Sequence, residues 1–129
     1  MQDVDLPAPQ PGPCDLLVDV RAISVDPVDS KIRASVSAET GEWKVLGWDA
    51  MGTVRAVDNE VTLFKVGDRV WYAGAVNRSG ANSEQHLVNE RIAALPPKSL
   101  SDAEAAAMPL TTITAWAWHA VIHPKENRC

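Results

Sequence analysis

Histidine and cysteine, which serve as metal ligands and nucleophiles, are scarce in this sequence, with three and two residues. His119 and His123 stand four residues apart, a spacing that places two imidazoles on one face of a helix. No third ligand accompanies them, so we interpret the pair as fortuitous. Cys14 and Cys129 permit one disulfide at most, unlike the framework of a secreted protein, and we expect reduced thiols. His86 falls in an expected strand, where it should face the sheet or solvent and not a metal.

Two aspartates and two tryptophans are the remaining candidates for a binding site. Asp26 precedes Pro27, where it suits the N-cap of a helix, and this interpretation requires no chemistry. Trp43 and Trp48 could form an aromatic wall for a flat ligand or could pack in the core, and both interpretations stay open. Asp26 and Asp49 alone make a poor zinc site, because zinc requires three or four ligands. Neither a G-x-G-x-x-G motif nor a Walker-type loop occurs in the sequence.

The central segment Leu46–Val57 is the element around which we expect the chain to fold. Gly47 and Gly52 bracket a turn, and the residues after it alternate with a period of two, as in a half-buried strand. Val66–Tyr72 then places a Gly-Asp turn before a second strand that is rich in β-forming residues. We expect these two strands to be neighbours in a small β-barrel.

The rest of the chain is expected to form short strands and helices. Prolines make residues 1–13 an extended arm that cannot donate regularly to a sheet. Ser101 and Glu104 form a capping box, which opens a helix that Pro109 ends. The elements predicted after the arm are strand 15–24, helix 27–34, strands 83–88 and 91–95, helix 101–108 and a second helix from about Thr111.

Length and charge limit the classes of function. The 129 residues suffice for one domain, which at this size buries about two-thirds of its unfolded surface. The net charge of -5 argues against nucleic acid and anionic membranes as partners, because both attract clustered Lys and Arg. No stretch approaches the roughly 18 consecutive apolar residues of a membrane span, and the start does not fit a signal peptide. We therefore expect a soluble, cytoplasmic protein.

A series of motifs in this order resembles a known family. The motifs are Pro11-Gly12-Pro13, Ile23 to Asp29, Gly47 to Gly52, Val66 to Val70 and Leu110 to Trp116. Together they resemble the catalytic, GroES-like domain of the medium-chain dehydrogenase/reductase superfamily, whose members attach this domain to a Rossmann domain that binds NAD(P)H. The resemblance implies a mainly β fold, a GroES-like partly open β-barrel with short helices. It assigns residues 14–118 to this domain, with a junction helix from about 111, and leaves 1–13 as an arm and 119–129 as a divergent tail.

The resemblance favours the zinc-independent quinone oxidoreductase branch. In zinc-dependent alcohol dehydrogenases a Cys matches Asp26 and a Gly-His-Glu matches Gly47-Trp48-Asp49, so Trp48 stands in place of a histidine ligand. The implied cofactor is NADPH without zinc, and the implied substrate is a small quinone or enone. By resemblance, the cofactor-binding residues are Asp26, Lys31 and Thr114, the catalytic residues are Asp26 and Lys31, and the substrate-binding residues are Trp43, Trp48 and Asp49. Residue by residue, the alternatives are a helix cap for Asp26 and a solvated helix face for Lys31.

Two further expectations concern activity and assembly. Because no dinucleotide fingerprint is present, we expect the chain alone to be inactive. The alternative is a free-standing GroES-like module that binds a small ligand or a protein. In relatives the Rossmann domain covers the helix near Trp116, so the apolar side chains of Trp116, Trp118, Val121 and Ile122 would need another cover. We predict a homodimer through this helix, and the competing arrangement folds the helix back over the barrel.

Overall fold

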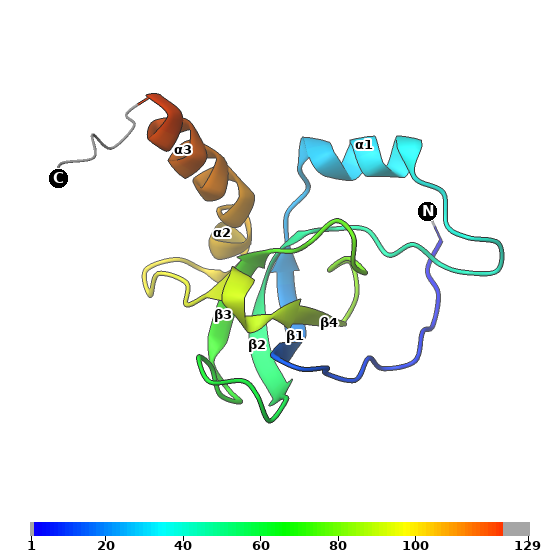
Figure 1. The fold of residues 1–129 in the computed structure, drawn as a ribbon, viewed down its shortest axis with the longest axis horizontal. Helices are drawn as coiled ribbons and strands as arrows, with labels where there is room; N and C mark the ends of the chain where they lie inside the picture. The colour runs from blue at the N-terminus through cyan, green and yellow to red at the C-terminus, as the bar shows by residue number, and fades with distance from the viewer. Residues whose placement is uncertain (1, 123–129) are drawn as a thin grey trace, which may run out of the picture.

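A curled antiparallel sheet forms the body of the molecule, as the ribbon in Figure 1 shows. The computed structural model describes residues 2–122, apart from the side chains of residues 120 and 122. The strands are β1 (Asp15–Ile23), β2 (Asp49–Val57), β3 (Arg69–Ala73), β4 (Gln85–Asn89) and β5 (Ala93–Ala94), in the spatial order β4-β1-β2-β3-β5. This half-barrel confirms the predicted mainly β, GroES-like fold, and β2 and β3 are neighbours as expected.

The larger of two buried apolar clusters is built from the strands of this sheet, and the smaller one places Met51 of β2 against Ala105 and Ala106. Leu16 and Val18 of β1, Val54 of β2 and Tyr72 of β3 are almost completely buried in the larger cluster. Gly52 lets β1 and β2 approach closely, since a Cβ at this position would overlap the Asp19 carbonyl oxygen. The sheet is therefore held by apolar packing between its strands, and Gly52 permits the close approach of β1 and β2.

Short helices join the strands, and their ends follow the predicted caps. The helices are α1 (Pro27–Ser35), α2 (Asp102–Ala106) and α3 (Pro109–Ile122), with a 3-10 turn, η1 (Glu90–Ile92). The Asp29 carboxylate accepts the backbone N–H of Asp26, the N-cap of α1, at 2.8 Å. Ser101 and Glu104 form the predicted capping box of α2. Both helix starts are thus confirmed.

Three local predictions were wrong in detail. The turn expected between Gly47 and Gly52 ends earlier, because β2 begins at Asp49 and Gly52 lies inside it. The predicted strand 91–95 is η1 followed by the two-residue β5, because the Asn89 side chain accepts the Arg91 N–H and caps a turn there. The last helix begins at Pro109 and not near Thr111. Proline is well suited to the first position of a helix, because a backbone N–H there would have no acceptor within the helix.

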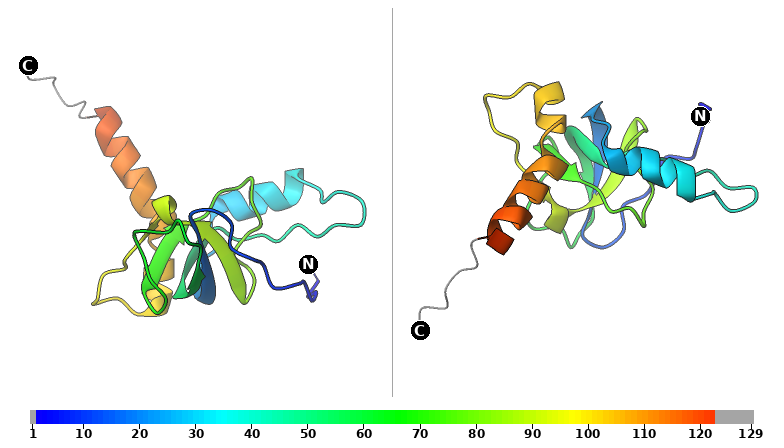
Figure 2. Two further views of the ribbon diagram at one scale, coloured as in Figure 1. Left: turned by 60° about the horizontal axis from the view of Figure 1, so that its bottom comes forward. Right: turned by 90° about the horizontal axis from the view of Figure 1, so that it is seen from above.

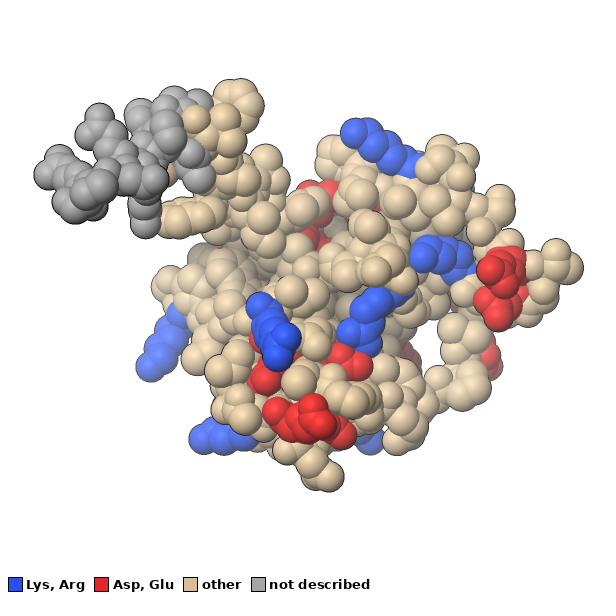
Figure 3. Space-filling model, viewed as in Figure 1, with Lys and Arg blue, Asp and Glu red and all other residues tan. Residues whose placement is uncertain are grey.

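The two ends of the chain leave the barrel in different directions. Residues 2–12 form no helix or strand, and α3 projects away from the sheet in both views of Figure 2. On the face drawn in Figure 3, acidic and basic side chains are interspersed over the surface. Within the described part of the chain, no helix is both long and apolar enough to cross a bilayer.

Candidate functional site

Asp49 lies where the starts of three elements meet. It is the first residue of β2, and its side chain is buried, with an exposed fraction of 1% for the residue. Its carboxylate oxygens accept the Leu110 N–H in the first turn of α3 at 3.1 and 3.2 Å. Its backbone carbonyl accepts the Ser24 N–H at 3.1 Å, and the Ser24 hydroxyl donates to Asp26 at 3.3 Å. These bonds connect β2 with the start of α3 and with the segment that leads into α1.

Three carboxyl groups gather at this point, and we call Asp26, Asp29 and Asp49 the acidic junction. Burial raises the pKa of Asp49 to about 6, and the Leu110 N–H opposes this change because it stabilises the ionised form. The nearby carboxyl groups of Asp26 and Asp29 raise the pKa further by repulsion. Asp49 therefore changes its charge within the range of pH near neutrality, which is unusual for an aspartate.

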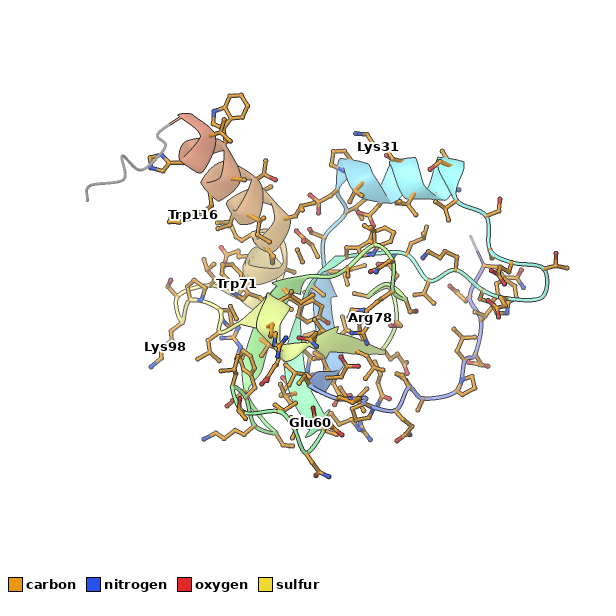
Figure 4. The ribbon with its side chains drawn as sticks, viewed as in Figure 1. Lys31, Glu60, Trp71, Arg78, Lys98 and Trp116 are labelled. Carbon is orange, nitrogen blue, oxygen red and sulfur yellow. The ribbon has the colours of Figure 1, made fainter. Side chains whose placement is uncertain are left out.

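The predicted cofactor residues occupy three different surroundings. Asp26 is half-buried and is the N-cap of α1, as the helix-cap interpretation predicts. Lys31 is exposed on the side of α1 that faces away from the sheet (Figure 4). Thr114 is exposed on α3, where its hydroxyl donates to the Leu110 carbonyl oxygen at 2.9 Å. The structure brings Asp26 to Asp49, whereas the roles of Asp26, Lys31 and Thr114 toward a cofactor remain predictions.

The two tryptophans of the expected aromatic wall have different environments. Trp48 is buried, with an exposed fraction of 2%, and its indole N–H donates to the Ala75 carbonyl oxygen at 3.2 Å. Trp48 therefore packs in the core, one of the two interpretations that the sequence left open. Trp43 lies in the loop before β2 and is 55% exposed, so its ring is accessible to a ligand. Of the predicted substrate residues, Trp43 is thus exposed, whereas Trp48 and Asp49 are buried in this structure.

The residues at this site do not fit zinc. An indole offers no lone pair to a metal, and the Trp48 ring is packed in the protein. Among the described residues, no three His, Cys, Asp or Glu side chains are grouped as metal ligands. Of the histidine pair, His119 is exposed on α3 and His123 lies outside the described residues, as does Cys129.

Sequence reasoning missed a buried polar pair in the barrel. His86 was expected to face the sheet or solvent, and at 4% exposure it lies against the sheet, stacked on the Tyr72 ring. Its Nε2 lies 2.9 Å from the Ser79 carbonyl oxygen, which can only accept, so Nε2 carries the proton and Nδ1 accepts from the Tyr72 hydroxyl at 2.9 Å. Burial lowers the pKa of His86, because it disfavours the charged form of the ring. Only its position on an alternating strand could have indicated this environment.

Two surface hollows lie away from the predicted site residues. One of about 110 Å³ is lined by His86, Pro9 and Arg78, whose guanidinium binds the Asp15 carboxylate in a two-pronged contact at 2.8 and 2.9 Å. The other, of about 300 Å³, lies over charged and polar side chains that include Arg55. Neither hollow includes a residue of the acidic junction.

Comparisons with known proteins agree with the fold and with the order of the motifs. Residues 12–110 match the family model of the alcohol dehydrogenase GroES-like domain. A zinc-type alcohol dehydrogenase-like protein of Staphylococcus aureus is 48% identical over 108 residues, which cover 84% of this chain and 32% of that protein. The chain is thus similar to a protein about three times as long.

Solved structures show the same relationship. An alcohol dehydrogenase superfamily protein from Novosphingobium aromaticivorans has a TM-score of 0.79 at 37% identity, covering 88% of this chain and 36% of that chain. The Escherichia coli quinone oxidoreductase, solved with NADPH, has a TM-score of 0.77 at 28% identity, covering 96% of this chain and 36% of that chain. The chain spans about a third of the length of these relatives. It belongs to the alcohol dehydrogenase GroES-like domain family, within the medium-chain dehydrogenase/reductase superfamily.

Proposed function

We propose that this chain is the substrate-side domain of an NADPH-dependent, zinc-independent quinone or enone oxidoreductase. The observation that carries the proposal is Trp48, which stands where zinc-dependent relatives have a histidine ligand and whose ring is buried in the barrel. Membership of the family supports an oxidoreductase, and the quinone oxidoreductase relative supports the substrate class. The active protein would combine this domain with a cofactor-binding domain, because the chain carries no dinucleotide fingerprint.

In this proposal, the chain supplies one wall of the cofactor cleft. NADPH, when bound, would supply the hydride. The exposed ammonium of Lys31 can attract a phosphate, and the exposed hydroxyl of Thr114 can reach a cofactor on the same side as α3. Asp26 would orient groups at the start of α1, and its negative charge would keep phosphates away from the acidic junction. Trp43 would offer an exposed ring for a flat substrate.

A fusion protein tests the function class. Residues 1–122 of this chain would be joined to the remaining two-thirds of the Staphylococcus aureus relative, and turnover would be measured with NADPH and 1,4-benzoquinone. We expect reduction of the quinone that persists after treatment with a chelator. The variant Lys31→Gln should raise KM for NADPH, whereas Lys98→Gln, also exposed but on another part of the surface, should not. Activity that requires zinc, or oxidation of alcohols without quinone reduction, would contradict the proposal.

A second measurement concerns the chain without a cofactor domain. We propose that the 129-residue chain alone is inactive, since one wall cannot hold the pyrophosphate and ribose that a Rossmann domain binds. Titration of NADPH into the purified chain, followed by nicotinamide fluorescence, should show no saturation in the micromolar range. Saturable binding would overturn this part of the proposal. From the charge and composition, we also propose a cytoplasmic location.

An exposed apolar helix supports a second candidate, a protein-binding module. The exposed fractions on α3 are 71% for Trp116, 68% for Trp118 and 76% for Val121. Burial of apolar surface stabilises by about 25 cal/mol per Å², so a few hundred Å² left in water forfeit several kcal/mol. We propose that the chain forms a homodimer through the apolar side chains of α3.

Light scattering of matched variants tests this assembly. Trp116→Ser should convert the dimer to a monomer at micromolar concentration. Trp43→Ser removes an indole that is exposed in a loop far from α3 in sequence, and this variant should remain dimeric. A monomeric wild-type chain, or equal behaviour of the two variants, would contradict the dimer.

A further inference from the structure

Asp49 contacts the attachment points of two helices that are otherwise loosely fixed. In α1, Asp29 is the one buried residue, with an exposed fraction of 8%. In α3, Pro109 is buried, while residues 111–119 are all exposed. Both helices are therefore fixed mainly by groups of their first turns. These groups meet at Asp49, whose carboxylate accepts the Leu110 N–H of α3. Its backbone carbonyl accepts the Ser24 N–H, and the Ser24 hydroxyl donates to the carboxylate of Asp26, the N-cap of α1.

The charges around Asp49 oppose one another. The N-terminus of α3 carries a partial positive charge, and the Leu110 N–H points at the carboxylate, which favours the ionised form. From the side of α1, the negative charges of Asp26 and Asp29 repel an ionised Asp49 and favour the protonated form. On β2 itself, the backbone carbonyl of Asp49 is occupied by the Ser24 N–H, so this bond is independent of protonation.

We propose that Asp49 is a proton-dependent connector between the two helices. The ionised side chain holds the start of α3, and the protonated side chain binds the start of α1. When ionised, both of its oxygens accept, and the charge complements the start of α3. When protonated, its O–H donates to the Asp26 carboxylate, and the remaining oxygen accepts the Leu110 N–H as a neutral group. One proton thus weakens the cap of α3 and binds β2 to the start of α1, with no other atom transferred.

The connector would matter for the cleft because Thr114 lies on α3 and Lys31 lies on α1. A change in how rigidly each helix is attached to the sheet would change how well these residues are held around a cofactor. This consequence rests on the proposed function, whereas the connector does not. The test below uses the chain without a cofactor, so the two proposals can fail separately.

The test is an NMR titration of the complete 129-residue chain between pH 4.5 and 8. We expect the Leu110 amide signal to shift with a midpoint near 6, the value to which burial raises the pKa of Asp49. Loss of the charge-assisted bond should make Leu110 amide exchange about five-fold faster at pH 5 than at pH 7.5, after correction for the intrinsic rate. The Val54 amide, in the middle of β2, should show no such excess.

Three variants separate the connector from other titrations. Asp49→Asn should abolish the Leu110 midpoint, and Asp26→Asn should move it to lower pH, because a like charge is removed. Asp5→Asn removes one charge from the exposed arm and should leave the midpoint unchanged. If Asp49→Asn does not fold, Asp26→Asn and the wild type still decide. A Leu110 signal that is constant over this range, that titrates unchanged in Asp49→Asn or Asp26→Asn, or that exchanges without excess at pH 5 overturns the proposal.

Discussion

Replacement of Glu90 would measure how a single buried carboxylate holds the loop between β2 and β3. Glu90 lies in η1 and is 4% exposed. Its Oε2 accepts two backbone N–H groups of that loop, Thr62 at 2.9 Å and Leu63 at 2.8 Å. Its own N–H donates to the Cys14 carbonyl oxygen at 2.9 Å, so the residue joins the start of β1 to the loop.

The bonds in the structure set the expected loss of stability. A hydrogen bond to a charged group contributes about 1.5–3 kcal/mol, and Glu90→Ala removes two that share one oxygen. Because the bonds share that oxygen, we expect a loss of about 3–5 kcal/mol, a large part of the 5–15 kcal/mol typical of a whole domain. Glu90→Gln keeps an oxygen acceptor and loses only the charge, so we expect about 1–2 kcal/mol.

Urea denaturation followed by circular dichroism would measure these losses. Glu60→Gln is the matched control, because Glu60 is an exposed glutamate at the start of the same loop (Figure 4). This control should change the free energy of unfolding by less than about 0.5 kcal/mol. Equal stability of the Glu90→Gln and Glu60→Gln proteins, or Glu90→Ala no less stable than Glu90→Gln, would refute the reasoning.

Three other perturbations have expected outcomes. Burial raises the pKa of Asp49 from 3.8 to about 6, so the folded state binds its proton more tightly than the unfolded state does. The free energy of unfolding of the wild type relative to Asp49→Asn should therefore rise by about 2–3 kcal/mol as the pH falls from 7.5 to 4, and a constant difference in urea titrations would contradict this. Gly52→Ala should cost about 3 kcal/mol in thermal unfolding, because its methyl group would overlap the Asp19 carbonyl oxygen; a wild-type melting temperature would exclude that contact. Arg78→Lys should cost about 1 kcal/mol, because an ammonium cannot reproduce the two-pronged contact with Asp15, and denaturant midpoints equal to the wild type would contradict it.

Local patterns determined most of the elements of the fold. The alternation after Gly52 predicts the second part of β2, whose first residues were expected in a turn, and the Gly-Asp turn at Gly67 predicts β3 beside it. The N-caps Asp26 and Ser101 predict the starts of α1 and α2. These signals succeed because each depends on residues a few positions apart. The same locality explains the failure at residues 91–95, where the Asn89 side chain favours a turn over a strand.

The environment of the candidate site was decided by the tertiary structure. The sequence offered Trp48 as either an aromatic wall or a core residue, and only the packed barrel shows its ring buried. Asp49 was expected to meet a substrate, yet its carboxylate lies against Leu110, 61 residues further along the chain. The elevated pKa of Asp49 follows from burial and from the carboxyl groups brought beside it. Residue types and local spacing therefore determined which groups are available, while their burial, partners and charge depend on contacts between distant segments that form only when the whole chain folds.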